Sequence, residues 1–139
     1  MEGRYLGWYA AACGYSGFLR WAYDAWPADP MRDARHTLWP AGDCFLVYPG
    51  GNSSIRFEKL REGIVDYEKI RLLRELAGRS ASKKANELMK SLESHLNRFS
   101  AERDYAKRDY DVAGMTAAVE QGKQLLGALS LELGRSDGK

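Results

Sequence analysis

Six side chains between residues 20 and 48 combine flat aromatic rings with opposite charges. They are Arg20, Tyr23, Asp24, Trp26, Trp39 and Tyr48. Indole and phenol rings offer apolar faces that suit the C–H face of a sugar ring, while Arg and Asp suit its hydroxyl groups. We therefore treat the six as candidate sugar contacts. Trp26, Trp39 and Tyr48 are the candidate platforms, and plain packing is the alternative for each of them.

Other residues that could do chemistry have simpler interpretations. Trp8 and Trp21 are expected in the core, and Asp43 is expected to cap a strand or form an ion pair rather than act in catalysis. Four carboxylates follow in one helical stretch, but helical spacing spreads them over the surface beside basic partners three to five residues away. They are Glu58, Glu62, Asp66 and Glu68, with Arg61, Lys69 and Arg71 as partners.

Composition narrows the class of protein. The chain has 139 residues, enough for one domain with a core, and its net charge of +2 gives no electrostatic footprint for nucleic acid. Cys13 and Cys44 are not in a C-x-x-C pair, so two free thiols are expected. The residues at the N-terminus lack the pattern of a signal peptide, no run is long enough to span a bilayer, and no metal-ligand or cofactor-binding spacing occurs. No cofactor, metal or membrane partner is therefore predicted, and the compartment stays open.

The hydrophobic pattern predicts an α/β order of elements. A helix is expected at 4–13, a strand at 17–23, a loop with three prolines at 27–43, a second strand at 44–49, and a long amphipathic helix at 55–77. Ser53 or Ser54 is the candidate cap of that helix. Two more helices are expected at 82–99 and 112–133. Both strands read as buried and parallel, and two strands alone make a marginal sheet.

Three ordered blocks carry a family resemblance. They are RYLGWYAAACGYSGFLRWAYDAW, WPAGDCFLVYPG and SIRFEKLREGIVDYEKIRLL. Together they resemble the C-terminal part of glycoside hydrolase family 123 and the related domain of unknown function 4091, over roughly residues 3 to 78. The resemblance implies a (β/α)8 TIM barrel, of which residues 1–78 would be the last βα units and residues 79–139 a helical hairpin tail. A barrel needs about 250 residues, so the chain would be a C-terminal fragment.

The resemblance also implies an activity, for which this sequence lacks the catalytic pair. Relatives act on β-linked N-acetylgalactosamine-type sugars by substrate assistance, with an adjacent Asp-Glu pair orienting the acetamide and protonating the leaving oxygen. Full-length relatives are expected to be exported. No adjacent Asp-Glu pair occurs in this sequence, so no catalytic residue is assigned and the chain alone is expected to be inactive.

Two other classes of function stay open: a non-catalytic carbohydrate-binding module and a protein-interaction module. The predicted partners are an N-acetylhexosamine-type glycan and either the missing barrel half or a second copy paired through exposed strand edges.

Overall fold

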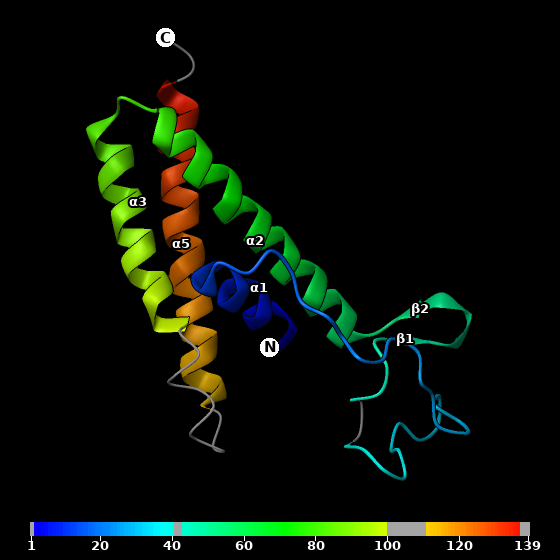
Figure 1. Cartoon of the computed structure of the whole chain (residues 1–139). Coiled ribbons are helices and arrows are strands. Elements are labelled where there is room, and N and C mark those ends of the chain that lie inside the picture. Colours follow the sequence, from blue (N-terminus) through cyan, green and yellow to red (C-terminus); the bar gives the residue numbers. More distant parts are fainter. Residues whose placement is uncertain (1, 41–42, 100–110, 137–139) are drawn as a thin grey trace.

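Helices dominate the computed structural model, which describes residues 2–40, 43–99 and 111–136. In this described part, four α-helices pack together: α1 (Glu2–Cys13), α2 (Ile55–Arg79), α3 (Lys83–Leu96) and α5 (Val112–Ser136). Figure 1 shows α3 and α5 side by side along their lengths, with α2 meeting them near the α2–α3 turn and α1 crossing α2. A short 3-10 turn, η2 (Asn97–Phe99), extends α3.

Local sequence signals explain where these helices begin and end. The Ser54 hydroxyl accepts a hydrogen bond from the Phe57 amide at 3.1 Å and caps α2, as predicted. Ser82 caps α3 in the same way. The first helix ends at Cys13, because Gly14 takes a φ of 69°, in the left-handed region that glycine adopts readily.

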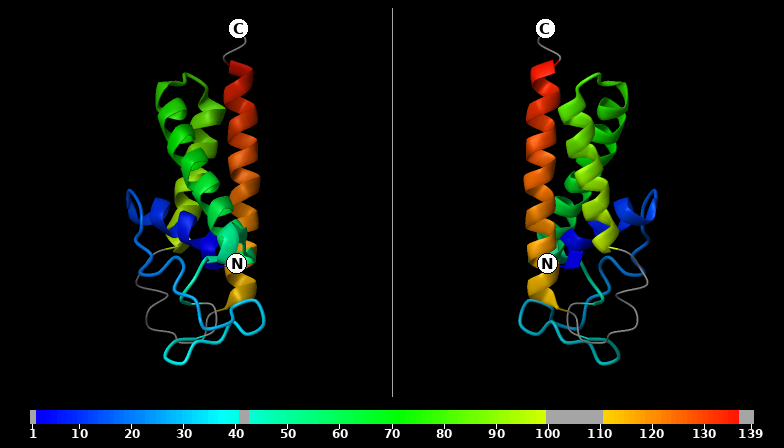
Figure 2. Two further views of the ribbon diagram at one scale, coloured as in Figure 1. Left: turned by 90° about the vertical axis from the view of Figure 1, so that its right-hand side faces the viewer. Right: turned by 90° about the vertical axis from the view of Figure 1, so that its left-hand side faces the viewer.

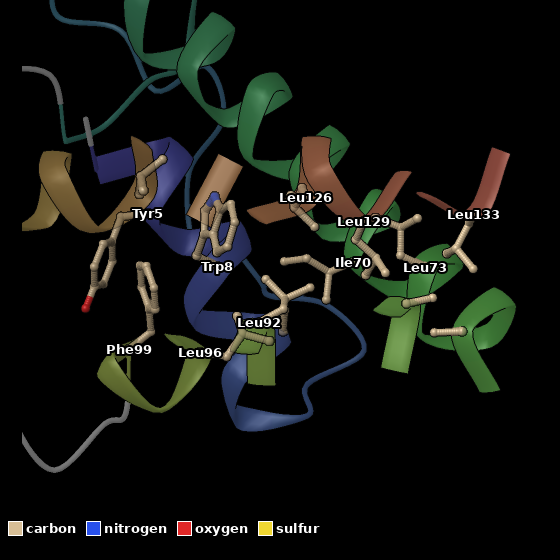
Figure 3. Packing of buried hydrophobic residues seen from close by; sticks show 14 residues of the cluster. Tyr5, Trp8, Ile70, Leu73, Leu92, Leu96, Phe99, Leu126, Leu129 and Leu133 are labelled. Atoms are coloured by element: carbon tan, nitrogen blue, oxygen red, sulfur yellow. The ribbon is translucent and has the colours of Figure 1, made fainter. Parts of the chain in front are cut away.

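The core runs between the four helices, from Tyr5 and Trp8 of α1 to Leu133 of α5. The Trp8 indole is fully buried and stacks on Phe99 at 5.5 Å between ring centroids, which confirms its predicted core role. Figure 3 shows this ring among leucine and isoleucine side chains of the other helices. The large members of the cluster include Tyr5, Ile70, Leu73, Leu92, Leu96, Leu126, Leu129 and Leu133. Residues before and after position 78 therefore share one core, and the predicted boundary at that position remains a prediction.

The predicted barrel fragment is wrong. The described residues contain no parallel strands; their one sheet is a two-residue antiparallel hairpin of β1 (Val47–Tyr48) and β2 (Asn52–Ser53), joined by a 3-10 turn, η1 (Pro49–Gly51). Gly50 and Gly51 take φ values of 76° and 77°, which lets the chain reverse there. The predicted strand 17–23 is irregular, and of the predicted strand 44–49 two residues are in β1.

The two predicted strands meet, but in the opposite direction. Asp24 and Phe45 form an isolated antiparallel bridge. Parallel pairing needs a crossover connection, usually a helix, and the intervening loop contains Pro27, Pro30 and Pro40, which do not suit a helix interior. The expected association through strand edges rested on strands that the described structure does not contain.

An irregular segment, described over residues 14–40 and 43–46, occupies one end of the molecule. Figures 1 and 2 place much of it with the β1–β2 hairpin near the N-terminal end of α2, away from the α2–α3 turn. The predicted helices at 55–77, 82–99 and 112–133 correspond to α2, to α3 with η2, and to α5. The predicted linker between the last two lies mostly outside the described residues. The irregular segment thus packs at one end of the helices.

Candidate functional site

Backbone hydrogen bonds hold two stretches of the irregular segment together. The Leu46 amide donates to the Tyr23 carbonyl at 2.7 Å, and the Ala25 amide donates to the Cys44 carbonyl at 3.1 Å, on either side of the Asp24–Phe45 bridge. Residues 44–47 are buried beneath this contact. The two stretches that carry the predicted site residues are therefore brought side by side, although by antiparallel contact rather than at the ends of barrel strands.

Two tryptophans from these stretches form an exposed pair. The rings of Trp21 and Trp39 lie 5.4 Å apart between centroids and are tilted by 50°. Trp21 is 56% exposed and Trp39 is 50% exposed. The prediction that Trp21 lies in the core is wrong: without a sheet covered by helices, residues 17–21 have no buried face to occupy.

An ion pair lies next to this tryptophan pair in the sequence. Arg20 Nη2 donates to Asp43 Oδ1 at 2.7 Å and also to the Asp43 backbone carbonyl. Both side chains are about one-third exposed (33% and 39%). The ion-pair interpretation of Asp43 is confirmed. Arg20 therefore offers a partly exposed guanidinium that is already oriented by a carboxylate.

The remaining predicted site residues lie along the same contact. The Tyr23 ring meets Phe57 of α2 edge-on at 6.1 Å between centroids, and Trp26 Nε1 donates to the Val47 carbonyl at 2.7 Å. Both rings are still partly exposed, at 50% and 39%. The half-buried Tyr48 packs on Phe45, its ring centroid at 5.2 Å. The Asp24 carboxylate is exposed and has no partner among the described residues.

Sequence reasoning missed one side chain of this region. The Arg56 guanidinium lies over the Phe45 ring, with Cζ at 5.0 Å from the centroid, a cation–π arrangement. Its Nε and Nη2 atoms are buried without a hydrogen-bond partner among the described residues. The available signal was its place in the first turn of α2, directly after the buried run 44–47.

A second missed feature is a buried charge cluster on the helices. Arg4 Nε and Trp8 Nε1 both donate to Asp66 Oδ2, at 3.2 and 3.0 Å, and Arg4 Nη1 donates to Glu120 at 2.9 Å. Arg4 and Asp66 are buried, so the predicted surface position of Asp66 is wrong. Glu58 and Glu68 do form the predicted surface pairs, with Arg61 and Arg71. The cluster joins α1 to α2 and α5.

Comparison with protein families decides the identity of the chain. It matches the family described as Glycoside hydrolase 123, catalytic domain, over residues 1–73, which is more than half of its 139 residues. The chain belongs to this family. The predicted family resemblance is therefore confirmed. A search of curated proteins finds no match to the chain.

The match gives the irregular segment its context. Residues 1–73 contain α1, the segment 14–46, the hairpin and most of α2, whereas α3 and α5 lie outside the match. All six predicted site residues thus fall in the part that belongs to a glycoside hydrolase 123 catalytic domain. Members of a glycoside hydrolase family act on carbohydrate, so carbohydrate is the class of ligand to consider for these side chains.

Two carboxyl groups of the described residues are poorly suited to act as a general acid. A catalytic acid needs a pKa near the working pH. The pKa of each is moved away from that range: hydrogen bonds from Arg35 lower the pKa of Asp33 to about 2, and the Lys59 ammonium, with Arg4 and Lys123, lowers the pKa of Glu62. In the described part, no three His, Cys, Asp or Glu residues are grouped to hold a metal ion. No described helix is long and apolar enough to cross a membrane.

Proposed function

We propose that residues 14–40 and 43–53 form a carbohydrate-contacting surface of a glycoside hydrolase 123 catalytic domain, and that this chain holds the sugar rather than transferring the proton. The exposed Trp21–Trp39 pair carries the proposal. Large exposed apolar surfaces in soluble proteins mark binding sites, and the family narrows the ligand to carbohydrate.

The chemistry of the pair suits a sugar ring. The two tilted indoles offer faces to sugar C–H groups, and the Arg20–Asp43 ion pair supplies donors and acceptors for hydroxyl groups. Since Arg20 is held by Asp43, its guanidinium loses less conformational entropy when a hydroxyl binds.

The other four candidates take supporting roles. The indole N–H of Trp26 is committed to the Val47 carbonyl, which leaves the ring face for contact. Tyr23 and Tyr48 are anchored by ring contacts and keep their hydroxyls for hydrogen bonding. Asp24 adds an exposed acceptor beside them.

The family resemblance suggests the kind of sugar. We assign an N-acetylhexosamine-type glycan, β-linked, because the three sequence blocks resemble enzymes that act on such sugars. No residue of this chain is assigned to proton transfer, since the sequence has no adjacent Asp-Glu pair.

The test is glycan binding by matched tryptophan variants. Trp21→Ala and Trp39→Ala should each weaken binding to an immobilised β-N-acetylgalactosaminide by about tenfold, on the scale of one aromatic contact, and should leave the thermal midpoint nearly unchanged. Trp8→Ala is the control, because it should lower the free energy of unfolding by about 3–5 kcal/mol as a core cavity. If all three variants lose stability equally and binding is unaffected, the proposal fails.

One observation favours a second candidate, a protein-docking surface. Leu19, Met31 and Leu38 in the same segment are 95%, 66% and 79% exposed, and large apolar side chains in one exposed region are typical of protein interfaces. A Leu19→Ser, Leu38→Ser variant separates the two functions. This variant should still bind glycan if the tryptophans hold sugar. If neither the unchanged chain nor the variant binds glycan, and only the variant fails to bind a protein partner, the docking function is favoured.

A further inference from the structure

A charged hollow of about 280 Å³ lies among the helices, separate from the six site residues described above. Seven of its eight lining residues are ionisable. The four basic ones are Arg4 of α1, Arg61 and Lys69 of α2, and Lys123 of α5. Three different helices therefore direct cationic side chains to one concave surface.

The carboxylates of this hollow are already engaged. Each has a basic partner: Asp66 with Arg4 at 3.2 Å, Glu58 with Arg61 at 2.9 Å, and Glu62 with Lys59 at 2.7 Å. Glu120, beside the hollow, also binds Arg4. Glu62 also lies 3.5 Å from Arg4 Nη1, and the charge of Lys123 helps to lower its pKa.

The basic groups of the hollow outnumber its carboxylates. Among the described residues, no carboxylate oxygen lies within 4.0 Å of the ammonium group of Lys69 or Lys123. Arg4 is 5% exposed, and its Nη2 is buried without a hydrogen-bond partner in the described part of the chain. An unpaired donor on a buried guanidinium costs free energy unless something accepts from it. Five basic groups here face four carboxylates, an excess of one positive charge.

We propose that this hollow is a second binding site, one that takes a phosphate or sulfate group. Two ammonium groups and a guanidinium from three helices suit an oxyanion with three outward oxygens, whereas a planar carboxylate is matched better by one arginine edge. A volume near the lower end of ligand pockets accommodates the anionic group with about one sugar ring. The site goes beyond the proposed function, because it shares no residue with the tryptophan surface.

The experiment is a calorimetric titration of the full chain with inorganic phosphate, inorganic sulfate, N-acetylgalactosamine 6-sulfate and unsulfated N-acetylgalactosamine. The double variant Lys69→Gln, Lys123→Gln should bind inorganic phosphate and inorganic sulfate about tenfold or more weakly, the scale of a lost charge-assisted hydrogen bond. Both lysines are exposed and unpaired, so the fold should be retained, and circular dichroism checks this.

The matched control is the double variant Lys83→Gln, Lys90→Gln, which also removes two positive charges, but from α3. Neither lysine of that pair has a carboxylate partner among the described residues. It should bind the anions as the unchanged chain does. Equal weakening in both double variants, or no anion binding by the unchanged chain, overturns the proposal. In the Trp21→Ala background, tighter binding of the sulfated sugar than of inorganic sulfate would identify a glycan as the source of the anion, and equal binding would identify the free ion.

Trp21→Ala keeps this test independent of the proposed function. If the tryptophan surface holds no sugar, the variant still binds phosphate as the unchanged chain does, and the anion site stands on its own.

Discussion

Gly7 of α1 and Gly63 of α2 meet backbone to backbone where the two helices cross. A Cβ on Gly63 would lie 2.5 Å from the Gly3 carbonyl oxygen and 2.9 Å from Arg4 Cα, and a Cβ on Gly7 would collide with the Gly63 carbonyl. This close approach is what brings Arg4 and Trp8 within hydrogen-bond distance of Asp66. The crossing therefore positions both the core and the charged hollow.

Gly63→Ala should lower the free energy of unfolding by about 1–3 kcal/mol, because the added methyl meets backbone that cannot move aside cheaply. Gly78→Ala is a matched control in the same helix. A Cβ there meets nothing within 4 Å, and alanine is the better helix former, so this change should stabilise the protein by roughly 0.5–1 kcal/mol. Chemical denaturation measures the free energy of unfolding of both variants. If both substitutions changed it in the same direction, the close crossing of α1 and α2 would be contradicted.

Asp66→Ala should lower the free energy of unfolding by about 3–5 kcal/mol, since it leaves the buried Arg4 guanidinium without its buried partner. The control is Glu68→Ala, two residues away on the exposed side of α2, whose pair with Arg71 should contribute about 0–1 kcal/mol. Comparable losses in the two variants would mean that Asp66 is not the buried anchor of α1.

The helices could be predicted from the sequence because their signals are local. Ser54 and the apolar spacing that follows define α2, and Gly14 ends α1, without reference to the rest of the chain. The strands could not, because a strand depends on its neighbours. The run 44–47 is buried as its apolar residues suggest, yet its pairing direction is decided by a proline-containing loop and not by its own composition.

The candidate site was predictable in residue type more than in arrangement. The chemistry of Trp39 and Arg20 indicates a binding role, but their partners, Trp21 and Asp43, lie 18 and 23 residues away along the chain. The sequence does not indicate the position of Arg56, because its contact with Phe45 is tertiary. Asp66 was misplaced because helical spacing offers it basic neighbours on α2, while its actual partner comes from α1.

The Asp33 carboxyl group should titrate near pH 2. Three hydrogen bonds from the Arg35 side chain, and one from its backbone amide, favour the ionised form of Asp33 and lower its pKa from 3.8 to about 2. The pKa is lower when folded, so the stabilising contribution is complete above the unfolded pKa and disappears as the pH falls from about 4 to about 2. Carbon-detected NMR of the carboxyl group measures this pKa.

Arg35→Ala should return the pKa of Asp33 toward 3.8, whereas Arg32→Ala, which removes a neighbouring charge, should leave it low. An unchanged pKa in the first variant would show that the Asp33–Arg35 pair does not form in solution.

The purified chain should not hydrolyse a chromogenic β-N-acetylgalactosaminide above the buffer rate. General acid catalysis contributes about 10²–10⁴-fold, and the sequence has no adjacent Asp-Glu pair to provide it. Asp24 is the exposed, unpaired carboxylate among the predicted site residues, so Asp24→Asn is the informative variant. Measurable turnover that this change abolishes would show that the chain carries its own acid.

The most direct measurement uses the four indole N–H signals in a proton–nitrogen NMR spectrum, because the chain has four tryptophans. Each signal is assigned by a Trp→Phe variant, and the protein is then titrated with methyl β-N-acetylgalactosaminide. The Trp21 and Trp39 signals should shift saturably, while the signal of Trp8, which is buried and bonded to Asp66, should stay in place. If the Trp21 and Trp39 signals do not shift at the highest sugar concentration, or if the Trp8 signal alone shifts, the proposed carbohydrate-contacting surface is contradicted.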